Sequence, residues 1–259
     1  MGLVEGMQVS QGFDSGAIEV IACGDSSADL AIRHDVTAGG EPSEFLQWFH
    51  FRVGGAENNG AELRIVNAGA TTYPDGWRDY RAVASWNRRD WERIPTRYDG
   101  QVLTISLPPA PGPSYIAYFG PFSWERHLVL LADCISRGAR VRRLGASIQG
   151  RDIDALVVGN GGRPVWIIAR QHPGETMAEW FVDGLLQRLL DETDEPARAL
   201  RRAATLYIVP NMNPDGSVLG NLRTNASGAN LNREWLAPSA ERSPEVQCVS
   251  DAMHATGCD

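Results

Sequence analysis

The sequence VWIIARQHPGE, residues 165–175, decides the fold of this chain. Its first five residues form a continuous apolar run, which predicts a β-strand buried on both faces. Pro173 then suits the first turn of a helix. Four apolar residues recur at intervals of four along that helix and predict that one side of it packs against a sheet: Met177, Phe181, Leu185 and Leu189.

A second apolar run follows this helix. Residues 205–209 read TLYIV and predict another buried strand. Strand, helix and strand in this order form an α/β crossover unit, and such folds place ligands at the carboxyl ends of their strands. We therefore expect an α/β domain with a mixed sheet and flanking helices, and a functional site in the residues that follow the two strands.

The chain ahead of this unit has a different pattern. Short alternating or apolar runs at residues 45–53, 63–66 and 102–107 predict strands, and Asp-Gly and Asn-Gly pairs predict turns between such runs. This spacing is typical of an all-β sandwich. We therefore expect a β-sandwich domain over residues 1–122 and an α/β domain, incomplete at its C-terminus, over residues 123–259.

Composition excludes several classes of protein. The sequence contains no lysine, so all 24 of its lysine-plus-arginine residues are arginines. A P-loop protein, a protein kinase and a Schiff-base enzyme each need a lysine. The net charge of −8 is spread along the chain, which argues against a nucleic-acid partner. The first ten residues resemble no signal peptide and no apolar stretch could span a membrane, so we expect a cytoplasmic protein without a membrane partner.

The first strand leads directly into a candidate metal site. His172 and Glu175 lie three residues apart at the start of the helix, so both side chains can face one point. Imidazole nitrogen and carboxylate oxygen are ordinary zinc ligands, and a catalytic zinc site needs three protein ligands and an open position. A His-x-x-Glu pair arises often by chance, however, so it decides nothing alone.

The residues after the second strand add weight to this pair. Residues 211–216 read NMNPDG, which predicts a tight turn at the same edge of the sheet. An irregular stretch, residues 220–235, follows this turn. It contains Arg223 and Arg233 among several asparagines. Arginine offers a planar fork of donors that can hold a carboxylate by two hydrogen bonds.

These motifs resemble, in order and spacing, those of the zinc metallocarboxypeptidases, and most of all the cytosolic carboxypeptidase branch, which includes enzymes that trim glutamate from protein tails. The resemblance rests on residues 172–175 (HPGE), 213–216 (NPDG), Arg223 and residues 232–235 (NREW). It extends to the front of the chain, where WFHFRV at residues 48–53 and AYFGPFSWERH at residues 117–127 look like the N-terminal domain of that branch.

The resemblance implies a role for each matching residue. His172 and Glu175 would bind one zinc ion, and Arg223 would polarise the scissile carbonyl and stabilise its oxyanion. Asn232 and Arg233 would bind the terminal carboxylate of a peptide or protein substrate. The family's third zinc ligand, a histidine, and its general-base glutamate lie further along the chain, so we expect both to fall beyond Asp259 and these 259 residues to be inactive alone.

The other histidines are expected to take no part in metal binding. His254 lies near the end of the last expected helix, and we expect it to interact with the helix terminus rather than with zinc. His34, His50 and His127 are expected to be structural or surface residues.

Two alternative functions are open: an aspartoacylase-like or desuccinylase-like zinc deacylase, and a module that binds C-terminal tails without cleaving them. The oligomeric state is not determined by the sequence.

Overall fold

The computed structural model describes residues 6–257, and its chain forms two compact units. The first unit contains the chain up to Asp35, Glu44–Pro121 and Leu219–Leu222. The second contains Val36–Ser43, Phe122–Val218 and the chain from Arg223 onward. Each unit therefore takes one short segment from the part of the sequence that mainly builds the other.

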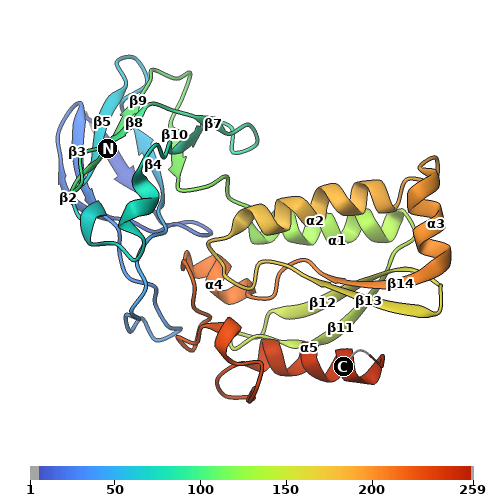
Figure 1. Ribbon diagram of the computed structural model, residues 1–259. Helices are drawn as coiled ribbons and strands as arrows, with labels where there is room; N and C mark the ends of the chain where they lie inside the picture. Colours follow the sequence, from blue (N-terminus) through green and yellow to red (C-terminus); the bar gives the residue numbers. More distant parts are fainter. Residues whose placement is uncertain (1–5, 258–259) are drawn as a thin grey trace, which may run out of the picture. The chain divides into compact units, whose positions relative to one another are not determined.

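The first unit is a sandwich of two five-stranded sheets (Figure 1). Fully buried side chains from both sheets share one core, among them Phe51, Leu63, Ile105 and Ile116. The expectation of an all-β front domain is thus confirmed. In sheet order, the first sheet is β1 (Gln8–Ser10), β4 (His50–Gly54), β10 (Ser114–Ala117), β6 (Val83–Ser85) and β7 (Glu92–Arg93). The second is β2 (Glu19–Cys23), β3 (Ser27–Ala31), β5 (Ala61–Ile65), β9 (Leu103–Leu107) and β8 (Thr96–Tyr98).

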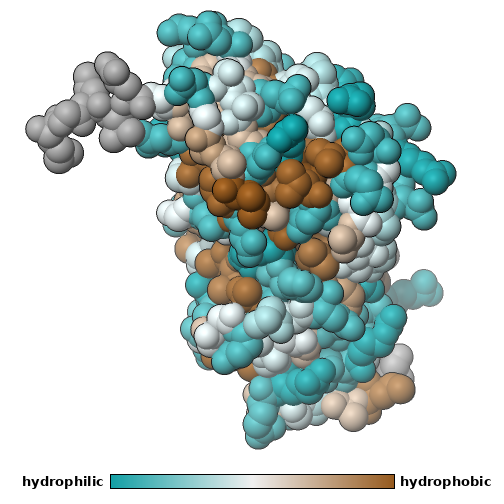
Figure 2. Space-filling view, turned by 90° about the vertical axis from the view of Figure 1, so that its left-hand side faces the viewer, coloured by the Kyte–Doolittle hydropathy of each residue, from teal (hydrophilic) through white to brown (hydrophobic). Residues whose placement is uncertain are grey.

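Strand β2 lies at an edge of the second sheet and is exposed along its whole length. Val20 and Ile21 on this strand are 46% and 60% exposed. Figure 2 shows one face of the protein, on which hydrophobic residues form small patches among hydrophilic ones. Scattered apolar side chains of this kind are normal on a protein surface.

The second unit is built on a four-stranded mixed sheet in the order β11-β12-β14-β13. Only β13 and β14 run parallel, and the other two pairs are antiparallel. Helices α1 and α2 lie on one face of the sheet and α5 on the other (Figure 1). The strands are β11 (Arg140–Ala146), β12 (Asp152–Gly159), β13 (Arg163–Ile168) and β14 (Ala204–Val209). The helices are α1 (Trp124–Ser136), α2 (Thr176–Leu189), α3 (Glu195–Ala203), α4 (Pro214–Leu219) and α5 (Pro244–Ala255).

The alternation of side chains along β12 explains the three layers. Leu156 and Val158 join the core under α1 and α2, whereas Ile153 and Ala155 join the core over α5. Successive side chains of a strand point to opposite faces, so one strand contributes to both cores. The expected α/β domain with a mixed sheet and flanking helices is confirmed. Among residues 6–257, no helix combines the length and the apolar character that crossing a membrane requires.

Local chemistry explains where α1 begins. Ser123 is its N-cap, and its hydroxyl accepts a hydrogen bond of 3.1 Å from the Arg126 N–H. This bond satisfies one of the free donors at the helix start. In the sequence, Ser123 directly before the helical pattern of Arg126, Leu128 and Leu131 predicts this capped helix. The apolar residues 146–148 predict a strand, but β11 ends at Ala146 and a turn follows. The arginine-rich β11 is an exposed edge strand and so gives no apolar signal of its own.

Two predictions of burial around β13 are wrong. The strand was expected to be buried on both faces, yet Val165 and Ile168 are 37% and 36% exposed because β13 lies at an edge of the sheet. On α2, Met177 and Phe181 were expected to face the core, but they are 44% and 62% exposed. The helix instead buries the side that carries Glu179. Because Glu179 is charged, a pattern of apolar residues at helical spacing does not indicate this side.

Candidate active site

The loop after β13 brings the two predicted metal ligands together. The Glu175 N–H donates to the His172 carbonyl over 3.1 Å and closes a turn just before α2. Within this turn, His172 Nδ1 lies 3.1 Å from Glu175 Oε1. Their side chains are 12% and 52% exposed, so the carboxylate borders solvent while the imidazole is mostly covered.

The geometry of this pair fits two ligands of one zinc ion. Two atoms that each lie about 2.1 Å from a tetrahedral zinc are roughly 3.4 Å apart, close to the observed separation. The other imidazole nitrogen of His172, Nε2, is buried and has no hydrogen-bond partner among the described residues. Residues 6–257 contain no cluster of three His, Cys, Asp or Glu side chains that could hold a metal, so they supply two candidate ligands of the three that such a site requires.

Two neighbouring groups favour the ionised form of the Glu175 carboxylate. The hydrogen bond from His172 lowers the pKa of Glu175, and the charges of His172 and Arg223 act in the same direction. Arg223 therefore acts electrostatically on Glu175. The ionised form of Glu175 is favoured, and this is the form that binds a metal cation.

A buried ion pair fixes the loop that carries His172. Arg170, in the left-handed conformation with a φ of 48°, donates to the Glu179 carboxylate over 2.7 Å and to the Pro173 carbonyl over 3.0 Å. The same carboxylate accepts from His127 Nδ1 over 2.7 Å and from Asn211 Nδ2 over 3.2 Å. Arg170, Glu179 and His127 are each at most 2% exposed. The loop is thereby tied to α1, to α2 and to the end of β14.

Sequence reasoning did not single out these positioning residues. His127 was expected to be structural or on the surface, and it is structural. Two signals could have revealed the others: Arg170 directly follows an apolar strand, and Glu179 lies between apolar residues of α2. Each charge in such a place needs a partner, because an unpaired buried charge is very costly.

The turn after β14 supports the same loop from the other side. Asn213 Nδ2 donates to the Gln171 carbonyl over 3.3 Å, and its own Oδ1 accepts from the Gly216 N–H over 3.0 Å. Asp215 is fully buried and accepts from Ser147, Gln149 and Arg151 of the β11–β12 turn. The predicted Asn-Pro-Asp-Gly turn therefore begins the short helix α4 and anchors two neighbouring loops.

Gly216 lets three site segments pack closely. A Cβ atom at this position would lie 2.4 Å from the Thr224 carbonyl oxygen, 2.7 Å from Asn213 Oδ1 and 2.9 Å from Pro173 Cγ. Thr224 belongs to the loop that carries Arg223, Asn213 to the turn after β14 and Pro173 to the loop that carries His172. Only a residue without a side chain allows such an approach.

The predicted carboxylate-binding residues lie on a neighbouring turn. Asn232 and Arg233 belong to a 3-10 turn, Leu231–Arg233, and both are exposed. Two residues further on, the Trp235 indole N–H donates to Gln171 Oε1 over 2.6 Å. This bond links the Leu231–Arg233 turn to the residue before His172. The connection between this turn and the metal-ligand pair is therefore indirect.

Glu245 on α5 contacts the loop that carries Arg223. Its Oε2 accepts from Asn225 Nδ2 over 3.0 Å, whereas its Oε1 is buried and has no hydrogen-bond partner among the described residues. Burial raises the pKa of Glu245 to about 7, and the nearby charge of Asp215 adds to the effect. The carboxyl group is therefore neutral over much of the acidic range.

The remaining histidines are buried structural residues or exposed ones. His50 is buried, its Nδ1 lies 2.9 Å from the Ser15 hydroxyl, and burial lowers its pKa to about 3. His34 is exposed in the first unit, and His254 is exposed in the last turn of α5. His50 is thus structural, as expected, and His254 joins no metal-binding group among the described residues.

The fold and the site together define a class of protein. An α/β sheet that presents a histidine and a glutamate beyond the end of a parallel strand, with an arginine nearby, is the framework of a metal-dependent hydrolase. Two family models match the chain: "Cytosolic carboxypeptidase N-terminal domain" over residues 9–119 and "Zinc carboxypeptidase" over residues 125–254. The chain belongs to the zinc carboxypeptidase family.

Known relatives agree with this assignment. A metallo-carboxypeptidase crystal structure from Burkholderia cenocepacia is 49% identical with a TM-score of 0.92, over 98% of this chain and 69% of that one. One from Pseudomonas aeruginosa, in complex with (2-guanidinoethylmercapto)succinic acid, is 46% identical with a TM-score of 0.90, over 96% and 67%. Cytosolic carboxypeptidase 6 of Caenorhabditis elegans is 28% identical over 92% of this chain. The chain spans 55% of that relative's length.

Replacing Glu179 tests the buried ion pair. Glu179→Gln leaves the Arg170 guanidinium buried without its counter-charge, so we expect the free energy of unfolding to fall by about 3–5 kcal/mol. Asp152→Asn is the matched control, because the Arg143–Asp152 pair is about half exposed and should contribute little to the unfolding free energy. Urea unfolding measures both. Equal losses in the two variants would contradict a special role for the buried pair.

Gly216→Ala tests the close packing of the three site segments. The added methyl group must displace the Thr224 carbonyl, so we expect a loss of about 1–3 kcal/mol in unfolding free energy. Gly184→Ala on α2 is the control, since its Cβ would meet nothing within 4 Å. It should stabilise the helix by up to about 1 kcal/mol. Thermal unfolding compares them, and a neutral Gly216→Ala would refute the packing argument.

Glu245→Gln tests the raised pKa. An unfolded chain releases this proton near pH 4.5 but the folded protein keeps it to about pH 7, so wild-type stability should decline between these values. The loss should be on the order of 3 kcal/mol, and the variant should lack it. Unfolding free energies at pH 4 and pH 8 measure the effect, with exposed Glu195→Gln as control. A wild-type-minus-variant difference that does not change with pH would show that Glu245 titrates normally.

Proposed function

We propose that this chain supplies the metal-binding and carboxylate-binding residues of a metallocarboxypeptidase that removes C-terminal amino acids from peptides or proteins. The observation that carries the proposal is the 3.1 Å approach of His172 to Glu175, with the charge of Arg223 acting on the same carboxylate. The chain spans part of its relatives' length, so the activity belongs to the whole protein. The name of the cytosolic carboxypeptidase branch supports a cytoplasmic location.

His172 and Glu175 would hold one zinc ion. Both ligand atoms lie on one short turn, which the Arg170–Glu179 ion pair keeps in place before any metal binds. When bound in such a site, zinc lowers the pKa of a water molecule and polarises a carbonyl group. The protein's own contribution is to hold an ionised Glu175 and an imidazole at ligand separation.

Arg223 would act on the carbonyl of the bond to be cleaved. A guanidinium group is always charged and presents several donors, so it can stabilise negative charge that develops on an oxygen atom. The charge of Arg223 acts on the Glu175 carboxylate, which supports such a role beside the metal-ligand pair. Gly216 supports this role, because it allows the loop around Thr224 to approach the His172 loop.

Asn232 and Arg233 would bind the terminal carboxylate of the substrate. Both are exposed, so their donors are available to a ligand, and Trp235 links their turn to Gln171 beside the metal-ligand pair. An exopeptidase must recognise a free carboxylate, and an arginine fork does so by charge-assisted hydrogen bonds. The succinic-acid derivative bound to the Pseudomonas aeruginosa relative is also a carboxylate compound. We propose glutamate as the first terminal residue to test.

Arg233→Ala tests the carboxylate-binding role in the full-length protein. Loss of a hydrogen bond to a charged group costs about 1.5–3 kcal/mol, so we expect binding of a glutamate-terminated peptide to weaken roughly 10- to 150-fold. Calorimetry should compare this peptide with its C-terminal amide, which the wild type should bind as weakly as the variant binds the acid. Arg97→Ala, an exposed arginine in β8, is the control.

Three outcomes would contradict the proposal. Equal affinity of the wild type for the acid and the amide would refute carboxylate recognition. Acid-selective binding that a chelator does not change, without release of the terminal residue, would favour the tail-binding module instead. Release of an acyl group from an N-acyl amino acid, with peptides untouched, would identify the deacylase alternative.

A further inference from the structure

An arginine-lined pocket lies in the second unit, far from the candidate active site. It has a volume of about 510 Å³ and lies where the end of α1, the start of β11, the end of β12 and helix α3 meet. Backbone bonds from Asn160 to Arg201 and from Gly161 to Ala204 place it at the amino ends of β13 and β14. The His172 loop follows the carboxyl end of β13, so one strand length, roughly 20 Å, separates the two sites.

The pocket concentrates positive charge in an acidic chain. Five arginines and a single acidic residue, Glu192, line it, which leaves a local surplus of four positive charges (five minus one). The whole chain carries a net charge of −8. Such a concentration in a hollow favours the binding of an anion. The arginines are Arg137, Arg140, Arg198, Arg201 and Arg202.

Within residues 6–257, hydrogen bonds and ion pairs occupy two of these arginines. Arg201 pairs with Glu192 over 2.9 Å and also donates to the Leu189 carbonyl, while Arg137 donates to the Gln187 carbonyl over 2.8 Å. Arg201 and Arg202 also lie in the last turn of α3, where positive charge complements the helix dipole. That effect does not account for the position of Arg140 on β11 or of Arg198 in the middle of α3.

Three guanidinium groups remain available to a ligand. The side chains of Arg140, Arg198 and Arg202 are exposed and form no hydrogen bond or ion pair with the residues that the structure describes. Each guanidinium carries five N–H donors in a fixed fork that matches two oxygen atoms of a carboxylate or a phosphate. Three such forks around one hollow suit a ligand with several anionic oxygens better than a single carboxylate.

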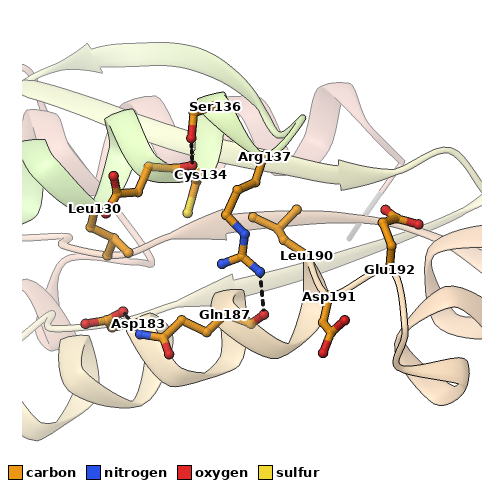
Figure 3. A pocket seen from close by; sticks show the side chains of 10 residues that line it. Leu130, Cys134, Ser136, Arg137, Asp183, Gln187, Leu190, Asp191 and Glu192 are labelled. Carbon is orange, nitrogen blue, oxygen red and sulfur yellow. Dashed lines mark hydrogen bonds between the residues drawn. The ribbon is translucent and has the colours of Figure 1, made fainter.

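A neighbouring pocket has the opposite charge, because acidic residues rather than arginines predominate in its lining. It has a volume of about 530 Å³ and shares Arg137, Leu190 and Glu192 with the arginine pocket, but its other charged residues are Asp133, Asp183 and Asp191. Figure 3 shows Arg137 reaching from the end of α1 towards Gln187 across this second hollow. Three aspartates therefore line the neighbouring pocket and five arginines line the arginine pocket, so of these two pockets the arginine pocket is the one that favours anions.

We propose that the arginine pocket binds a multiply charged oxyanion, as a free polyphosphate or as neighbouring carboxylates of an acidic peptide. This second site does not depend on the proposed peptidase function. Its volume accommodates a ligand of several anionic groups, and its distance from His172 keeps such a ligand out of the candidate active site. Charge-assisted bonds from Arg140, Arg198 and Arg202 hold the ligand.

Calorimetric titration of the full-length protein tests this site with two probes. Inorganic tripolyphosphate represents free phosphates, and an acetylated tetraglutamate amide represents an acidic peptide. The amide has no terminal carboxylate, so it reports on the arginine pocket rather than on the Arg233 turn. We expect at least one probe to bind saturably, and the double variant Arg198→Gln and Arg202→Gln to weaken that binding at least tenfold.

The control variant Arg97→Gln removes an exposed arginine of β8 and should change the affinity less than twofold. Thermal unfolding of each variant confirms that it is folded. Binding of tripolyphosphate alone would identify a phosphate ligand, and binding of the tetraglutamate amide alone an acidic peptide; either result supports the site. No saturable binding of either probe, or equal weakening in the double variant and the control, would overturn it.

Discussion

The buried ion pair between Arg170 and Glu179 is the interaction on which the site depends. Taking two charges out of water is costly, and good hydrogen bonds must offset that cost. Here the partners are complete: Arg170 reaches Glu179 and two backbone carbonyls, and Glu179 also accepts from His127 and Asn211. The pair joins two helices and two strand ends, so the turn that carries His172 and Glu175 has a fixed place on the sheet.

Around this anchor, the site is assembled from separate loops. The turn after β14 reaches the His172 loop through Asn213, and the Leu231–Arg233 turn reaches it through Trp235. Gly216 has no side chain, so the loop that carries Arg223 and Thr224 can approach closely. Polar bonds between loops, rather than one apolar core, therefore set the geometry of the residues proposed to bind metal and substrate.

Arginine has three different roles in this lysine-free chain. Arg170 is buried and structural, Arg223 and Arg233 are proposed to act on the substrate, and Arg140, Arg198 and Arg202 line a separate hollow. The guanidinium group suits all three roles because it stays charged and donates in a fixed plane. The second unit thus presents positive charge at both ends of its parallel strands, although the chain as a whole is acidic.

The sequence by itself determined the local elements: the capped start of α1, the parallel strands around a crossover, the β-rich front and the His-x-x-Glu turn, because each depends on neighbours a few residues away. Tertiary structure alone decided that Met177 and Phe181 are exposed while Glu179 is buried, since that depends on Arg170, His127 and Asn211 meeting across the fold. The arginine pocket was likewise hidden, because its residues come from four separate elements that only packing brings together.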